Sequence, residues 1–143
     1  MIMTKEQIQS IIPHREPMLL IDSIVAHQEG KSIEARFHVD EAWDIFRGHF
    51  PGSPVLPGVL AVESMAQASD VLLLSQPAFA GKIPYFIGID KVKFKSMILP
   101  GDEIEIHAAV LRENTEKAIV TCAAKILNKG VLAVEGEVTL AMR

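Results

Sequence analysis

The chain has 143 residues, 49% of them hydrophobic, and a formal net charge of −4. This length suffices for a core without disulfides or metals, and we expect residues 1–143 to form one domain. The acidic balance argues against nucleic-acid binding. No apolar run approaches the roughly 20 residues of a membrane span, and the N-terminus lacks the pattern of a signal sequence, so we expect a cytoplasmic protein without a membrane span. The single cysteine, Cys122, fits a reducing compartment and is interpreted as a core residue.

The first predicted elements are a short helix and two strands. Thr4-Lys5-Glu6-Gln7 is a capping-box pattern, and the helix that it starts should end before Pro13. Residues 19–26 are predicted to form a strand. Residues 31–39 are predicted to form a second one, because apolar and polar side chains alternate there. His27 should open the turn between the two strands.

A loop rich in glycine and proline then leads into a long apolar helix. In the loop, His49 lies between two glycines and is followed by Phe50 and Pro51, an arrangement that favours close backbone approach and a fixed imidazole. Residues 59–74 are apolar on nearly every side, which predicts a buried helix. Glu63 lies in the first turns of this helix.

The second half of the chain is predicted to consist of strands. Turn-like residues separate four candidates, which span residues 85–94, 103–111, 118–127 and 131–142. We expect this sheet to wrap around the long helix, because that helix is too apolar to face water. A sheet of this kind has edges with unpaired backbone groups, so we expect a homodimer that closes one of them.

Three segments resemble the β-hydroxyacyl-acyl-carrier-protein dehydratases of bacterial type II fatty-acid synthesis, the FabZ type. The sequence GHFPGSPVLPGVLAVESMAQ is similar to the signature of this family, and IIPHREPMLLIDSI and YFIGIDKVKFKSMILPGDEIEI are similar to its flanking segments. The resemblance implies an α+β hot-dog fold, in which an antiparallel sheet wraps around one central helix next to a short N-terminal helix. It also implies an (R)-3-hydroxyacyl-[acyl-carrier-protein] dehydratase, a hydro-lyase that produces the trans-2-enoyl thioester.

Dehydration of such a thioester needs a base, an acid and a group that stabilises negative charge. His49 suits the base, because neutral imidazole accepts a proton near physiological pH. Glu63 suits the acid, because a carboxyl group in apolar surroundings is costly to ionise, although the two roles could be shared or swapped. The amide of Gly58, at the start of the helix, is the expected donor to the thioester oxygen.

Further features follow from the resemblance alone. His49 of one subunit would face Glu63 of the other subunit in a homodimer, and three such dimers would assemble. The acyl chain would lie in an apolar tunnel at the interface, with Phe50 and Tyr85 at the tunnel or its gate. The partner would be an acyl carrier protein, and no cofactor or metal is expected.

Other polar residues have competing interpretations. Gln67 is expected to orient a catalytic group, although Glu63, Gln67 and Asp70 could instead form a narrow solvated stripe on the helix. His14 matches a family position and is interpreted as structural. A row of three lysines is either a solvated or guarded strand face or a docking patch for an acidic carrier protein: Lys91, Lys93 and Lys95.

Three alternative functions share this fold: a dehydratase that also isomerises the double bond, an acyl-thioester-binding sensor, and a thioesterase. The isomerising branch generally carries aspartate at the helix position, so Glu63 favours plain dehydration. A pure binding protein would need neither His49 nor Glu63. Two departures from the family pattern, Glu16 and the Ser64-Met65 pair, remove no expected catalytic group.

Overall fold

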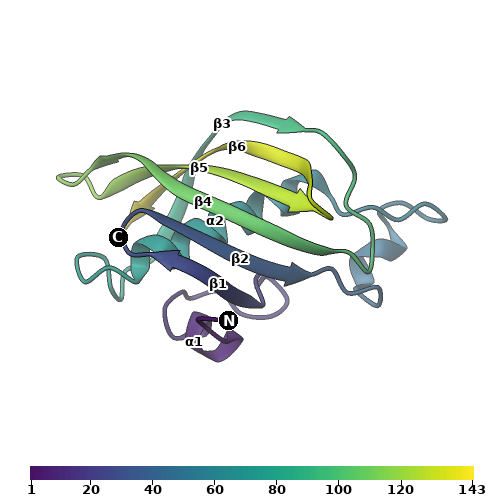
Figure 1. Ribbon diagram of the computed structural model, residues 1–143, viewed down its shortest axis with the longest axis horizontal. Helices are drawn as coiled ribbons and strands as arrows, with labels where there is room; N and C mark the ends of the chain where they lie inside the picture. The colour runs from purple at the N-terminus through teal and green to yellow at the C-terminus, as the bar shows by residue number, and fades with distance from the viewer.

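The computed structural model describes all residues from 1 to 143 as one sheet, one long helix and two short helices (Figure 1). The elements in chain order are α1 (Lys5–Gln9), β1 (Ser23–Gln28), β2 (Ser32–His38), the 3₁₀ helix η1 (Asp44–Arg47), α2 (Gly58–Leu74), β3 (Pro84–Phe94), β4 (Glu103–Asn114), β5 (Ile119–Asn128) and β6 (Val131–Met142). All strand pairs are antiparallel, and the sheet has six strands in the order β1-β2-β4-β5-β6-β3. The predicted hot-dog architecture is therefore confirmed.

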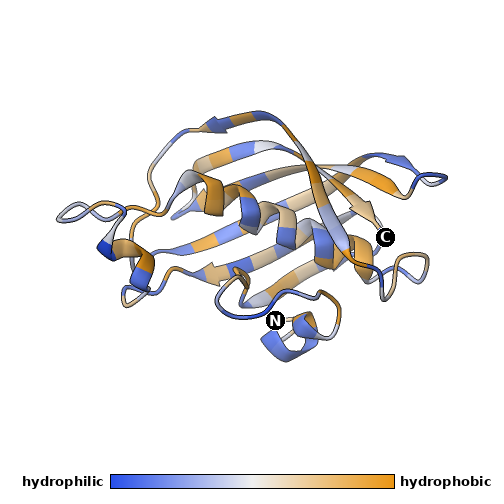
Figure 2. Cartoon of the chain, turned by 180° about the vertical axis from the view of Figure 1, so that it is seen from behind, coloured by the Kyte–Doolittle hydropathy of each residue, from blue (hydrophilic) through white to orange (hydrophobic).

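The long helix α2 lies across one face of the sheet (Figure 2). It begins at Gly58, directly after Pro57, and ends at Leu74. It packs against β2, β3, β4, β5 and β6, and its side chains are buried from Ala61 onward with the exception of Glu63. A helix that is apolar all round is stable only when its surroundings bury it, and here the curved sheet does so.

The two edges of the sheet differ in how they are covered. At the β1 edge, the amides of Ile2 and Met3 donate to the carbonyl of Ile24, so the N-terminal segment pairs with that strand. At the opposite edge lies β3, which pairs only with β6. Unpaired backbone groups along β3 make it the available edge for a further strand.

An aromatic group anchors the base of the loop that carries His49. Trp43 packs edge-on against Phe37 of β2, with ring centroids 6.4 Å apart, and against Phe46 of η1 at 5.9 Å. Farther along, the amide of Leu56 donates to the carbonyl of Ile98. Both ends of the loop are thus attached to the sheet and its flanks, while its tip is exposed.

The structure corrects several predicted boundaries. The first strand begins at Ser23 and not at Leu19, and His27 lies within it, opposite Ile33, so it does not open a turn. The strand β4 continues to Asn114, through residues that were predicted to form a turn. The helix η1 was not predicted. None of the helices combines the length and the apolar character needed to cross a bilayer.

Candidate active site

His49 is held by the loop that surrounds it. Its Nδ1 lies 2.8 Å from the carbonyl oxygen of Val55, and the Val55 amide donates to the carbonyl of His49 at 2.9 Å. A carbonyl oxygen can only accept a hydrogen bond, so Nδ1 carries the proton and Nε2 has a free lone pair. The ring stacks on Phe50 with centroids 4.0 Å apart, across a cis peptide bond. The loop therefore holds the imidazole in the tautomer that a base requires.

The start of α2 presents unpaired amides. Pro57 occupies the N-cap without a side-chain hydrogen bond, and no partner accepts from the amides of Gly58 and Val59. A Cβ on Gly58 would lie 2.7 Å from Cε1 of Phe94, so a side chain here would displace this exposed ring. The helix dipole adds partial positive charge at this end, which suits an oxygen that develops negative charge.

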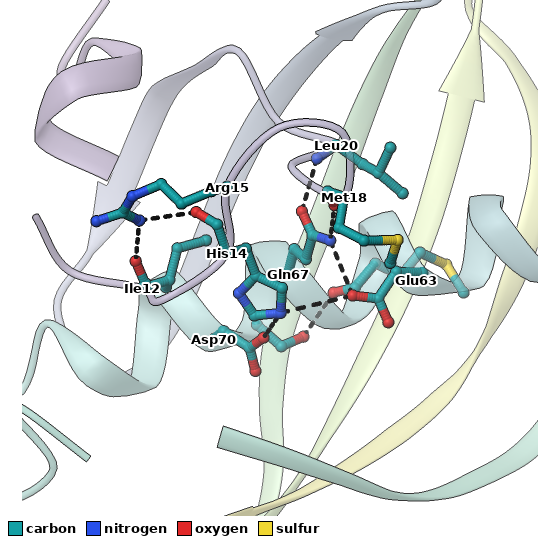
Figure 3. A network of polar contacts seen from close by, with 10 residues as sticks. Ile12, His14, Arg15, Met18, Leu20, Glu63, Gln67 and Asp70 are labelled. Atoms are coloured by element: carbon teal, nitrogen blue, oxygen red, sulfur yellow. Dashed lines mark hydrogen bonds and ion pairs between the residues drawn. The ribbon is translucent and has the colours of Figure 1, made fainter. Parts of the chain in front are cut away.

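Glu63 is oriented by Gln67, one turn farther along α2 (Figure 3). Gln67 is fully buried and makes three hydrogen bonds: its Nε2 donates to Oε2 of Glu63 at 2.8 Å and to the carbonyl of Met18 at 2.7 Å, and its Oε1 accepts from the amide of Leu20 at 2.7 Å. Because its amide is fixed at three points, Gln67 restricts the Glu63 carboxyl to one side of the helix.

His14 lies over the same face of α2, where the segment that precedes β1 crosses the helix (Figure 3). Its Nε2 is 3.6 Å from Oε2 of Glu63 and 3.7 Å from Oδ2 of Asp70. Arg15 braces this segment, because its guanidinium donates to the carbonyls of Gln9, Ile12 and His14. The stripe formed by Glu63, Gln67 and Asp70 is covered by protein, so the solvated-stripe alternative is wrong for the two residues that are buried, Gln67 and Asp70.

The charges of this cluster depend on burial. Desolvation, followed by the negative charge of Glu63, raises the pKa of Asp70 well above its usual value. Burial lowers the pKa of His14; the charge of Glu63 opposes this shift and that of Arg15 adds to it. The environment of the cluster thus favours the protonated form of Asp70 and the neutral form of His14.

The structure does not bring His49 and Glu63 together within one chain: no hydrogen bond or ion pair joins them. Two cavities, of about 920 and 330 Å³, include neither side chain. Apolar side chains are instead exposed on β3, at the start of α2 and in the loop before it: Tyr85, Ile87, Ile89, Phe94, Val59 and Phe50. One chain thus displays an uncovered apolar surface where the tunnel and its gate were predicted.

The three lysines do not form a regular row. A β-bulge interrupts β3 between Asp90 and Lys93, Lys91 has a φ of 55°, and Lys95 lies beyond the end of the strand. Lys91 and Lys93 line the larger cavity on the sheet together with Glu135 and Glu137, and Lys91 pairs with Glu137 at 3.6 Å. Lys91 and Lys93 thus share one cavity on the sheet, whereas Lys95 lies outside the strand, and the neighbouring acids partly neutralise the positive charge.

One cluster elsewhere has ligand types that suit a metal. Glu34, Glu105 and His107 place oxygen and nitrogen atoms within 4.8 Å of one another. Nη2 of Arg36 lies 2.7 Å from Glu34 and 3.1 Å from Glu105. The guanidinium offsets part of the negative charge of the two carboxylates.

Two residues beside the site, His14 and Phe94, were not assigned to it from the sequence. His14 was interpreted as structural, although the spacing of Glu63, Gln67 and Asp70 indicated a polar face that needed a partner. Phe94 was treated only as a strand residue, and no sequence signal linked it to Gly58.

Comparison with known proteins agrees with the fold and the motif. The model of the FabA-like domain family matches residues 12–137. The 3-hydroxyacyl-[acyl-carrier-protein] dehydratase FabZ of Oenococcus oeni is 46% identical over 118 residues, which cover 81% of this chain and 85% of that protein. The FabZ of Enterococcus faecalis is 43% identical, with 93% and 94% covered.

Solved structures show the same fold at lower identity. The dehydratase heterocomplex ApeI:P from Xenorhabdus doucetiae matches with a TM-score of 0.80 at 18% identity, covering 95% of this chain and 90% of that one. A hypothetical thioesterase with coenzyme A from Streptococcus pneumoniae matches with a TM-score of 0.63 at 11% identity, with 85% and 84% covered. The high identity to curated dehydratases, over nearly the full length of both chains, identifies this chain as a member of the FabZ-type 3-hydroxyacyl-[acyl-carrier-protein] dehydratase family.

Proposed function

We propose that this chain removes water from (R)-3-hydroxyacyl thioesters carried on acyl carrier protein, and that His49 and Glu63 are its catalytic residues. The observation that carries the proposal is the fixed tautomer of His49, whose Nδ1–H is used by Val55. An imidazole whose second nitrogen is a free acceptor is equipped to take a proton. The similarity to FabZ dehydratases supports the reaction type, the carrier-bound substrate and the hydro-lyase class.

In the proposed reaction, Nε2 of His49 removes the proton alpha to the thioester carbonyl. Negative charge then develops on the thioester oxygen, where the free amides of Gly58 and Val59 stabilise it. The bond between the β carbon and the hydroxyl oxygen breaks as Glu63 donates a proton to that oxygen, and water leaves. Each group acts on a different atom of the substrate, which explains why all three are needed.

We propose that each active site is shared between two subunits. Within one chain no hydrogen bond or ion pair joins His49 to Glu63, and the cavities of about 920 and 330 Å³ include neither side chain. A second copy that pairs along β3 would cover the exposed side chains of Tyr85, Phe94 and Val59. That contact would enclose an apolar tunnel for the acyl chain and bring the two catalytic groups to opposite sides of it. A trimer of such dimers remains the expectation from the family resemblance.

The first test follows hydration of a crotonyl thioester by the loss of enoyl absorbance. The wild type should turn over, whereas His49→Ala and Glu63→Gln should each lose about 10²- to 10⁴-fold in kcat, the range typical of general acid–base groups. Release of free thiol would indicate a thioesterase, binding without turnover would indicate a sensor, and a cis-3 product would indicate an additional isomerase activity. Retained activity in either variant would refute the assigned roles.

The second test asks whether the site is shared. His49→Ala and Glu63→Gln chains are unfolded together and refolded as a mixture. If each site takes its histidine and glutamate from different chains, a mixed dimer contains one intact site, and the mixture should recover about a quarter of wild-type activity, since half of the dimers are mixed and each has one of two sites. Each variant refolded alone is the control. No recovery in the mixture, when mixed dimers are verified by mass, would show that both groups come from one chain.

The carrier protein would dock on the lysines at the end of β3. Lys91, Lys93 and Lys95 remain the predicted contacts, although Lys91 already pairs with Glu137. If they steer the acidic partner, Lys93→Glu should raise KM for the carrier-bound substrate and leave KM for a short coenzyme A substrate unchanged. An equal change for both substrates would exclude a role in docking.

A further inference from the structure

Asp70 is a carboxyl group in the core with no evident structural purpose. It lies on α2 between Ser69 and Val71, and only 2% of its surface is exposed. Its Oδ1 has no hydrogen-bond partner, and neither does Nδ1 of His14. A buried carboxyl group without hydrogen bonds costs free energy, so its presence calls for an explanation other than stability.

The geometry connects Asp70 to the proposed acid. A single atom, Nε2 of His14, faces both carboxyl groups, at 3.6 Å from Oε2 of Glu63 and 3.7 Å from Oδ2 of Asp70 (Figure 3). The rest of the arrangement is rigid, because Gln67 fixes Glu63 from the other side and Arg15 braces the backbone that carries His14. Small movements of the imidazole would bring Nε2 within hydrogen-bond distance of either oxygen.

Few other charges act on the cluster. On α2 the neighbour is Glu63, and from the segment before β1 the neighbours are His14 and Arg15. From the sheet, the thiol of Cys122 on β5 is close enough to interact with Asp70, and burial raises its pKa to about 11, so it is neutral. Glu113 of β4 acts on that thiol and does not shift the pKa of Asp70. Burial and the negative charge of Glu63 both favour the protonated form of Asp70, which faces the shared nitrogen of His14.

We propose that Asp70 and His14 are positioning residues that hold a reserve proton for Glu63 and deliver it through Nε2 of His14. The proposal rests on the role of Glu63 as the acid. In the transfer, the O–H bond of Asp70 breaks as an N–H bond forms on Nε2, which gives an imidazolium next to the Asp70 carboxylate. That N–H bond then breaks as an O–H bond forms on Glu63. The net result is a protonated Glu63, a neutral His14 and an ionised Asp70, which regains its proton from solvent after water has left.

The deciding variant is Asp70→Asn, which preserves size and polarity but cannot release a proton. The measurement is the pH profile of kcat for dehydration of a 3-hydroxyacyl thioester, the direction in which Glu63 gives up a proton. We expect the alkaline limb to move down by about one pH unit, the scale of coupling between neighbouring carboxyl groups, with little change in KM. His14→Gln should produce the same shift, because it removes the shared nitrogen. Since this substitution lies in a half-buried segment outside the core helix, it also serves if Asp70→Asn folds poorly.

Ser64→Ala is the matched control. Ser64 is buried on the same helix, and its hydroxyl donates only to the carbonyl of Ala61. The pH profile of Ser64→Ala should match that of the wild type. A uniformly lower kcat in Asp70→Asn and His14→Gln, with both limbs unmoved, would show that the two residues only support the fold and would overturn the proposal. Profiles identical to the wild type would overturn it as well.

The test separates this inference from the proposed function. If Glu63→Gln is inactive while Asp70→Asn has an unmoved profile, Glu63 remains the acid and the proton reserve is excluded. If Glu63→Gln is fully active, the acid role fails and the inference fails with it. Infrared difference spectra add a direct observation: a protonated carboxyl band at neutral pH should be present in the wild type and absent in Asp70→Asn.

Discussion

Gln67→Met should destabilise the protein strongly while hardly changing the volume of the side chain. Gln67 is fully buried, and its three hydrogen bonds are 2.7 to 2.8 Å long. Methionine would leave the buried amide of Leu20 without an acceptor, at a cost of about 1–3 kcal/mol. The carbonyl of Met18 belongs to an exposed residue and can bind water instead. Losing its hydrogen bond to Gln67 therefore costs only the net free energy of one hydrogen bond, about 0.5–1.5 kcal/mol. The free energy of unfolding should therefore fall by roughly 2–4 kcal/mol.

Equilibrium unfolding in urea, at one fixed protein concentration, measures this loss as a lower midpoint with an unchanged slope. Ser64→Ala, which removes a single helix-internal hydrogen bond, should change the free energy by less than about 1 kcal/mol and serves as the reference. The kcat of Gln67→Met should also fall by about 10- to 100-fold, because Glu63 loses the donor that orients it. A variant as stable as Ser64→Ala would refute the assignment of Gln67 as the link between α2 and the segment before β1.

Three further predictions concern other parts of the molecule. Gly58→Ala should lower stability by less than about 1 kcal/mol, because the exposed ring of Phe94 can turn away from the new Cβ. A larger loss that Phe94→Leu in the same chain recovers in a double-mutant cycle would show that the ring cannot move. Cys122, fully buried and with a pKa raised by that burial to about 11, should resist thiol reagents in the native protein and react at once in urea; rapid native labelling would contradict its placement. Burial opposes ionisation of Asp102, but hydrogen bonds from Leu99 and Asn128 and the charge of Lys129 prevail and lower its pKa. Its carboxylate should therefore stabilise the fold above the unfolded pKa of about 3.9 and lose this effect as the pH falls below that value. Asp102→Asn should be less stable than the wild type at pH 7 and approach it in acid. A difference in stability that does not depend on pH would argue against this ionisation.

The architecture was predictable because its signals are local. The length and uniform apolarity of α2 exclude a solvent-facing helix, and turns such as the one at Lys129 and Gly130, both with positive φ, separate strands of regular alternation. The residues from Leu19 to Asp22 misled the prediction for a physical reason. They are mostly buried, as a strand would be. The amide of Leu20, however, donates to Gln67 on the helix and not to a neighbouring strand. A hydrogen-bond partner 47 residues away cannot be inferred from alternation.

The site was predictable only where the motif itself specifies it. The loop around His49 and the start of α2 are continuous in sequence, so their local geometry could be anticipated. The contacts of His14 depend on how the segment before β1 crosses α2, and those of Phe94 depend on the bulge that redirects β3. Both arise from tertiary packing, for which composition and periodicity contain no signal.

Asp70 does not stabilise the fold in the way that its neighbours on α2 do. The next residues along α2, Val71, Leu72 and Leu73, are fully buried and stabilise the fold by apolar packing. A carboxyl group at position 70 contributes no such packing, and burial favours its protonated form by raising its pKa. Ser69 and Thr121, which are also buried, each satisfy their hydroxyl groups with a hydrogen bond, whereas Oδ1 of Asp70 has none. The simplest physical reason for this unsatisfied group is its contact with His14, because that contact connects the core of the helix to Glu63 at its surface.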